Sequence, residues 1–74
     1  MNQVDKVLNY IDQFGSISSM EAFMDLGVTR LAARISDIEH RGIAIDHEPE
    51  TSMNRFGEKV HYTRYRRHEE VAYG

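Results

Sequence analysis

Apolar residues in the first part of the chain recur with the period of an α-helix. In the first such stretch they are spaced i, i+3, i+4 and i+7, on one helical face; these residues are Val4, Val7, Leu8 and Ile11. Gly15 ends the pattern, as a glycine commonly does after a helix C-terminus. The pattern therefore predicts a first helix over residues 3–14.

A second, shorter helix is predicted over residues 19–25. Ser18 and Glu21 have the spacing of a capping box, in which each side chain accepts a hydrogen bond from the other residue's backbone N–H. The helical period places Met20 and Phe23 on the side that we expect to be buried.

A tight turn and a third helix follow. Gly27 suits the left-handed conformation at a helix end, and Thr29 is a good N-cap for the next helix. We expect this helix over residues 30–41, ended by Gly42. Its buried stripe consists of Leu31, Ile35 and Ile38. Two helices joined in this way have the sequence form of a helix-turn-helix.

After the third helix the hydrophobic period becomes alternating, as in half-buried strands. The alternating apolar residues are Ile43, Ile45, Val60 and Tyr62. We expect a β-hairpin of residues 44–52 and 58–65, because residues 54–57 between them, Asn-Arg-Phe-Gly, have turn chemistry. Pro49 lacks a backbone N–H and fits only an edge strand or a bulge, which predicts an irregular first strand.

The predicted order is an α+β fold, with a three-helix core containing the helix-turn-helix and a β-hairpin wing after it. Three segments carry a family resemblance: Phe-Gly-Ser-Ile-Ser-Ser-Met-Glu-Ala-Phe (14–23), Leu-Gly-Val-Thr-Arg-Leu-Ala-Ala-Arg-Ile-Ser-Asp-Ile (26–38) and Asn-Arg-Phe-Gly-Glu-Lys-Val (54–60). Along about residues 3–66 the chain resembles the winged helix-turn-helix family, and within it small phage- and prophage-type proteins. The resemblance implies binding of double-stranded DNA, with the third helix in the major groove.

Length and composition limit the chain to one small domain. It has 74 residues and no cysteine, so neither a disulfide nor a thiolate metal site is expected. We expect the winged helix-turn-helix domain over residues 1–66 and a flexible C-terminal tail over residues 67–74. No apolar run approaches the roughly 20 residues that cross a bilayer, and no signal peptide opens the chain. These features predict a soluble, cytoplasmic protein.

The charge is unevenly distributed along the chain. The net charge of −3 argues mildly against DNA binding, because DNA-binding domains are usually basic. Residues 1–53 hold four basic and nine acidic residues, whereas residues 54–67 hold five basic residues and one acidic residue. Since salt screens exposed charges beyond about 10 Å, such a basic segment can still bind a phosphate backbone locally.

The third helix carries the first candidate contacts with DNA. At about 100° per residue, four charged residues share a narrow outer arc; they are Arg30, Arg34, Asp37 and Arg41. Arg30 and Arg34 lie near the N-terminal end that a recognition helix inserts, and a guanidinium fits a guanine edge or a phosphate. Thr29 and the free N–H groups beside it suit a phosphate. Ala33 is small enough for close approach or for contact with a thymine methyl group.

A second interpretation of this arc stays open. Asp37 lies three residues after Arg34 and four before Arg41, so both pairs have the spacing of ordinary surface salt bridges, worth about 0.3–0.5 kcal/mol each. On DNA, Asp37 would accept from a cytosine amino group or orient an arginine. Arg41 suits either the last helix carbonyls or a phosphate.

The wing provides further candidates. Asn54, Arg55 and Lys59 surround its turn, where they would either contact the DNA backbone or minor groove or form a solvated turn. Arg64 and Arg66 near the end of the second strand would either clamp phosphates or protect an edge strand from aggregation.

The start of the second helix is a last candidate contact. Ser18 and Ser19 lie where a hydroxyl could bond a phosphate, although capping accounts for most of the expected role of Ser18. His47 and His61 would face each other across the hairpin, an arrangement compatible with zinc. Neither cysteines nor a His-Glu-x-x-His helix accompany them, so we expect no metal and no cofactor.

Catalytic motifs are absent from the sequence, which contains no Gly-x-Ser-x-Gly, phosphate loop or Gly-x-Gly-x-x-Gly. We therefore expect neither enzymatic activity nor a small-molecule substrate. The leading hypothesis is sequence-specific binding of double-stranded DNA, in transcription or in excisionase-like architecture, as a homodimer or as tandem copies. The alternative is a winged helix that binds another protein instead, in keeping with the acidity and the exposed aromatic residues.

Overall fold

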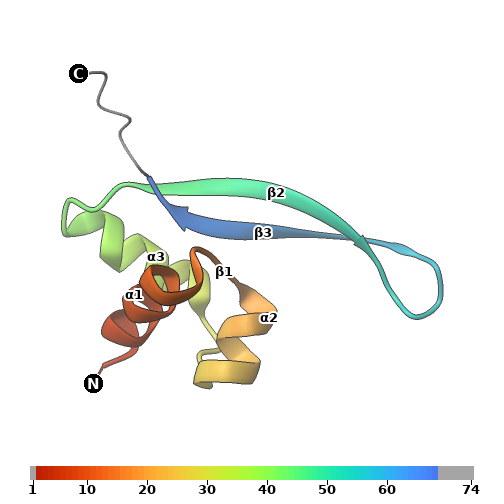
Figure 1. Cartoon of the computed structure of the whole chain (residues 1–74), viewed down its shortest axis with the longest axis horizontal. Coiled ribbons are helices and arrows are strands. Elements are labelled where there is room, and N and C mark those ends of the chain that lie inside the picture. Colours follow the sequence, from red (N-terminus) through yellow and green to blue (C-terminus); the bar gives the residue numbers. More distant parts are fainter. Residues whose placement is uncertain (1, 69–74) are drawn as a thin grey trace.

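The computed structural model describes residues 2–68 of the chain. Three helical stretches precede a long β-hairpin, whose far end projects beyond the helices (Figure 1). In chain order the elements are α1 (Gln3–Phe14), β1 (Ile17–Ser18), α2 (Ser19–Glu21), η1 (Ala22–Leu26), α3 (Leu31–His40), β2 (Ile45–Met53) and β3 (Lys59–Arg67). This arrangement confirms the predicted α+β fold with a hairpin wing.

The first helix has the predicted bounds. The side-chain Oδ1 of Asn2 accepts a hydrogen bond from the Asp5 backbone N–H at 2.8 Å and caps the N-terminus of α1. At the other end Gly15 has a φ of +90°, and its N–H donates to the Ile11 carbonyl at 2.7 Å. This left-handed conformation favours glycine and ends the helix.

The second helix differs from its prediction. Only Ser19–Glu21 is α-helical, and the chain continues as the wider π-turn η1. The extra residue in this turn changes the direction of the side chains relative to a regular helix. Consequently Ala22 is buried, whereas Met20 is 69% and Phe23 56% exposed. The prediction that Met20 and Phe23 are buried was therefore wrong.

The third helix keeps its predicted core but begins later. Its first α-helical backbone bond runs from the Arg34 N–H to the Arg30 carbonyl, so Arg30 occupies the N-cap position without a side-chain cap. The prediction of Thr29 as the cap was wrong, because Thr29 lies one residue too early. The predicted stripe is confirmed, with at most 2% of each side chain exposed: Leu31, Ile35 and Ile38.

The hairpin pairs over the full length of both strands. In the antiparallel register, Ile45 lies opposite Arg67 and Met53 opposite Lys59. The sheet order is β1-β3-β2, so β2 is an edge strand, as expected for the strand that contains Pro49. The strand is continuous through Pro49, contrary to the predicted irregularity. Hereafter β2, β3 and their turn are called the wing.

The end of the wing bears on the predicted domain boundary. β3 includes Arg67, one residue past the expected start of the tail, and the His68 N–H donates to the Ala44 carbonyl at 3.0 Å. The rest of the predicted tail, residues 69–74, lies outside the described residues.

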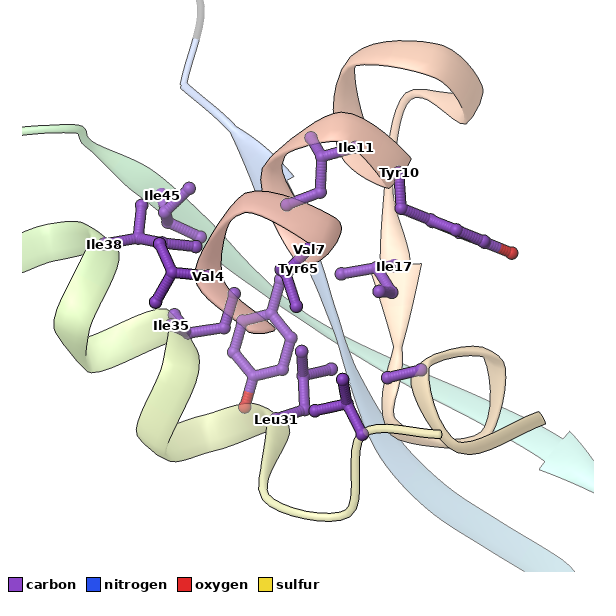
Figure 2. Close-up of a cluster of buried hydrophobic side chains, with 12 residues drawn as sticks. Val4, Val7, Tyr10, Ile11, Ile17, Leu31, Ile35, Ile38, Ile45 and Tyr65 are labelled. Carbon is purple, nitrogen blue, oxygen red and sulfur yellow. The ribbon is translucent and has the colours of Figure 1, made fainter. Parts of the chain in front are cut away.

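One hydrophobic core joins the helices to the root of the wing. Figure 2 shows side chains from α1 and α3 meeting the buried side chains of the strands, among them Ile17 and Tyr65. By contrast, every residue from Thr51 to His61 is exposed. The root of the wing is therefore fixed by packing, and its far half extends into solvent.

Candidate nucleic-acid interface

The outward surface of α3 is small and polar rather than basic. Opposite the buried stripe, steps of about 100° per residue place Ala33, Ser36, Asp37 and His40. The His40 ring Nδ1 lies 2.7 Å from the Ser36 carbonyl oxygen, so this ring folds back on the helix. Of these four residues, Ala33 and Ser36 leave little side-chain bulk over the helix backbone.

Arg34 lies on the flank of α3 that faces α1, not at the centre of the outer surface. Its Nη1 donates to Gln3 Oε1 of α1 at 3.2 Å. Its Nε lies 3.1 Å from Asp37 Oδ2, but this buried nitrogen makes no hydrogen bond of good geometry, so the contact is an ion pair only. Arg34 and Asp37 therefore form the i,i+3 pair that was the open alternative in the sequence.

Arg41 follows the same flank. Its Nη1 lies 4.0 Å from Asp5 Oδ1 of α1, at the limit of an ion pair between half-exposed side chains. Two of the four charged residues in the predicted arc, Arg34 and Arg41, thus lie along the seam between α1 and α3. Arg34 and Arg41 each have a carboxylate nearby.

Three exposed cations have no such partner. The side chains of Arg30, Arg55 and Lys59 make no hydrogen bond or ion pair with any residue between 2 and 68. Arg30 directly precedes α3, whereas Arg55 and Lys59 lie at the projecting end of the wing. Thr29, beside Arg30, is also exposed. These cations can meet an external anion without first breaking an internal ion pair.

The turn of the wing, residues 54–58, is held by Asn54. Its side-chain Oδ1 accepts hydrogen bonds from the backbone N–H groups of Phe56 at 2.9 Å and Glu58 at 3.0 Å. Gly57 completes the turn with a φ of +76°. Asn54 is also a predicted DNA contact, and its side-chain oxygen is engaged in the turn. The backbone that carries Arg55 is therefore fixed by hydrogen bonds.

Arg64 joins the wing to the beginning of α2. Its Nη1 donates to Glu21 Oε1 at 2.7 Å and to Ser16 Oγ at 3.1 Å, and its Nε donates to Glu50 Oε1 at 2.9 Å. Partial burial disfavours the charged guanidinium, yet the hydrogen bond to Glu21 and the nearby carboxylates raise the pKa of Arg64 above its ordinary value. Only 21% of its side chain is exposed.

Arg66 is also engaged within the wing. Its Nε donates to Glu48 Oε1 at 2.9 Å, between two half-exposed side chains. Both predicted strand-end arginines thus neutralise acidic residues of β2. The net charge of the chain does not reveal these ion pairs, because it counts paired and unpaired charges alike.

The predicted capping box is confirmed at the start of α2. Ser18 Oγ accepts the Glu21 N–H at 3.3 Å, and Glu21 Oε1 accepts the Ser18 N–H at 2.9 Å. Ser18 is only 5% exposed, whereas Ser19 lies at the surface. Of the two predicted serine contacts, Ser19 is therefore the one accessible to a phosphate.

The two hairpin histidines do not face each other. His47 lies opposite Tyr65, with its Nε2 3.4 Å from Glu39 Oε2 of α3, and His61 lies opposite Thr51. The register therefore separates the pair that the sequence had suggested. Among residues 2–68 no three metal-ligating side chains gather into a cluster.

Comparison with known proteins identifies the family of the chain. The model of the winged helix-turn-helix domain family matches residues 2–67, and the chain belongs to that family. Its members typically bind DNA and are generally not catalytic. No curated protein and no solved structure matches the chain. None of the helices within residues 2–68 is long and apolar enough to span a bilayer.

Proposed function

We propose that this winged helix-turn-helix protein binds double-stranded DNA with a sequence preference, through α3 and the wing. Its biological role would be that of a phage-type transcriptional regulator or an excisionase-like architectural factor. One observation carries the proposal: the unpartnered cations Arg30, Arg55 and Lys59 lie at the start of the predicted recognition helix and at the wing tip. These are the two regions from which winged helices reach the major groove and the flanking backbone.

The acidity of the chain does not oppose this assignment. Glu48 and Glu50, which lie on β2, are paired with arginines of β3. Their fields are therefore largely cancelled at a distance, and salt screens the remaining body charge beyond about 10 Å. A duplex at the wing tip would meet Arg55 and Lys59 at close range.

We expect residues in and just before the first turn of α3 to contact the bases. Arg30 is free to reach a base edge or a phosphate, and Ala33 on the outer surface permits close approach of the helix. To bind a guanine, Arg34 would give up its ion pair with Asp37 and its hydrogen bond to Gln3, and would donate to the base edge in their place. Thr29 and Ser19 are both exposed, and their hydroxyls would donate to phosphates.

A single copy would bind modestly, because one small DNA-binding module buries only about 600–1,000 Å² of protein surface. Two copies on adjacent half-sites would raise the affinity through avidity. We therefore propose that the protein acts as a homodimer or as tandem copies on DNA.

Selection from a pool of random duplex DNA tests the proposal. Enrichment of a common motif supports sequence-specific binding, and repetition within the motif reports the number of copies. The salt dependence of affinity then counts phosphate contacts. Three cations predict a slope of log K against log salt of about −2.7, whereas five, with Arg64 and Arg66 included, predict about −4.5. No enrichment and no salt-dependent binding would contradict the proposal.

One observation favours a second candidate function, recognition of another protein. A groove of about 500 Å³ separates α2 from the wing, and its lining includes the exposed side chains of Met20, Met53 and Val60. Flexible methionines are common at protein-binding surfaces. A winged helix used only in this way would give no enriched duplex and no steep salt dependence.

A further inference from the structure

Phe56 is the most exposed large hydrophobic residue among those that the structure describes. Its exposed fraction is 82%, compared with 63% for Phe14 and 56% for Phe23. Phe14 stacks on the Tyr10 ring, with the centroids 4.6 Å apart, whereas Phe56 has no ring contact with residues 2–68. An aromatic ring held in water forfeits the large gain that its burial brings, so a partner that covered this ring would recover that gain.

The backbone presents this ring from a fixed loop. The Phe56 N–H donates to Asn54 Oδ1 at 2.9 Å, and the Asn54 N–H donates to the Glu58 carbonyl at 2.9 Å. The Gly57 N–H donates to the Asn54 carbonyl at 3.1 Å. Because the turn is braced on both sides of Phe56, little backbone entropy is lost when the ring binds.

The tip around the ring carries two cations, Arg55 and Lys59, and one carboxylate, Glu58, and this net positive charge favours an anionic partner. Arg55 precedes Phe56 and Lys59 follows it at the first position of β3, and both are exposed and unpaired within residues 2–68. An apolar ring between two cations matches the chemistry of duplex DNA, where stacked base pairs lie between two rows of phosphates. The ring is the apolar part, and the cations would hold the phosphates on either side.

The shape of the wing is compatible with the minor groove. Residues 51–61 are all exposed, so the tip extends clear of the protein body (Figure 1). The minor groove of B-DNA is about 6 Å wide, and proteins that widen it insert apolar side chains between base steps.

We propose that Phe56 is an apolar wedge that enters the minor groove, partly unstacks one base step and bends the duplex. Arg55 and Lys59 bind the flanking phosphates. The proposal rests on the DNA binding proposed above and adds a source of selectivity, because pyrimidine–purine steps such as TA unstack most easily. The wing would then select DNA sequences whose base steps unstack easily, while α3 would select them by contacts with base edges.

A bending assay tests the wedge. The probe is a duplex of about 30 base pairs that carries the motif enriched by selection, a TA step where the wing lies, and a fluorescent dye at each end. Energy transfer between the dyes should report a bend in the range of about 20–90° with the natural protein. Phe56→Ala should abolish most of this bend and lower the affinity roughly tenfold.

Three variants make the result specific. Phe56→Leu keeps an apolar wedge and should retain most of the bend. Phe23→Ala removes an exposed phenylalanine of η1, which is not part of the wing, and should bend the duplex as the natural protein does. The salt slope should stay unchanged in Phe56→Ala, because no charge is removed, whereas Arg55→Ala should reduce it by about 0.9.

Several outcomes would overturn the wedge. A natural protein that binds but leaves the duplex straight, or a Phe56→Ala variant that bends it fully, rejects the wedge and leaves DNA binding intact. If sedimentation without DNA shows that Phe56→Ala dissociates a dimer, the ring serves self-association instead. Absence of any binding by the natural protein rejects the wedge and the proposed function together.

Discussion

The Arg64 guanidinium and the Glu21 carboxylate join the wing to the helix-turn-helix, with 2.7 Å between Arg64 Nη1 and Glu21 Oε1. The same carboxylate oxygen accepts the Ser18 N–H at 2.9 Å within the capping box. One oxygen therefore serves both the start of α2 and the root of the wing. The two surfaces that we assign to DNA are held in a fixed relation by this contact, across 43 positions in the sequence.

Replacing Arg64 should destabilise the fold without removing a DNA contact. Arg64→Ala leaves Glu21 and Glu50 without their shared partner in a partly buried site. We expect the free energy of unfolding to fall by about 1.5–3 kcal/mol, the range for hydrogen bonds to charged groups. Urea unfolding followed by circular dichroism measures this change. Arg66→Ala, whose pair with Glu48 is half-exposed, is the matched control and should cost about 1 kcal/mol or less.

The salt dependence of DNA binding separates the two possible roles of Arg64. If Arg64 acts only within the protein, Arg64→Ala keeps the slope of the natural chain even where the affinity falls. A slope reduced by about 0.9 would instead mean that Arg64 releases a counterion from a phosphate, and the structural role would be contradicted.

Alanine variants of Ser18 and Thr29 give a direct test of where the helices begin. Ser18→Ala removes the capping-box oxygen and should lower the free energy of unfolding by about 0.5–2 kcal/mol. Thr29→Ala should change it by less than about 0.5 kcal/mol, because Thr29 is exposed and caps no helix. Thermal and urea unfolding of the two variants provide the comparison. Equal losses would show that α3 begins at Thr29 after all.

Much of the fold could be predicted because its determinants are local. The bounds of α1, the capping box and the stripe of Leu31, Ile35 and Ile38 follow from residues less than two helical turns apart. The hairpin strands deviate from prediction by one or two residues at their ends. Gly27 was recognisable because few other residues accept its φ of +69°.

The errors share a different physical origin. The burial of Met20 and Phe23 was predicted from a regular helical period, which the π-turn after Glu21 interrupts. The charged residues of α3 have the spacing that was predicted, but the hydrogen bond from Arg34 to Gln3, 31 positions away in the sequence, was not predicted. Contacts such as this depend on how α1 packs beside α3. No spacing within α3 itself contains that information.

Tyr10 makes the domain sensitive to alkaline pH. Its hydroxyl donates to Asp25 Oδ2 at 2.6 Å, and this hydrogen bond, with the burial of the ring, raises the pKa of Tyr10 from 10.0 to about 12. A pKa raised by folding means that the protonated phenol stabilises the folded state. That stabilisation is complete below pH 10 and is lost as the pH rises through about 12.

Tyr10→Phe provides the measurement. Titration by tyrosinate absorbance should show that the variant has lost a group that titrates near pH 12 in the natural protein. The difference in unfolding free energy between the two proteins should shrink as the pH rises from 10 to about 12. A difference that stays constant over this range would show that the bond to Asp25 does not join α1 to η1 as described.

Asp37 should weaken DNA binding, because it places a carboxylate on the proposed recognition surface and holds Arg34 at 3.1 Å. Asp37→Asn removes that charge and releases the guanidinium. We expect the affinity for the enriched duplex to rise about fivefold, which corresponds to roughly 1 kcal/mol, the interaction of two unit charges about 4 Å apart in water. Fluorescence anisotropy at constant salt measures the change.

The control for Asp37→Asn must change the net charge equally. Asp12→Asn does so on α1, where Asp12 is half-exposed and lies 3.5 Å from Arg67, and it should leave the affinity nearly unchanged. Equal gains from both variants would mean that only overall charge matters. A gain from Asp37→Asn that disappears in the double variant with Arg34→Ala would identify Arg34 as the group that Asp37 restrains. No gain at all would place the DNA away from this side of α3.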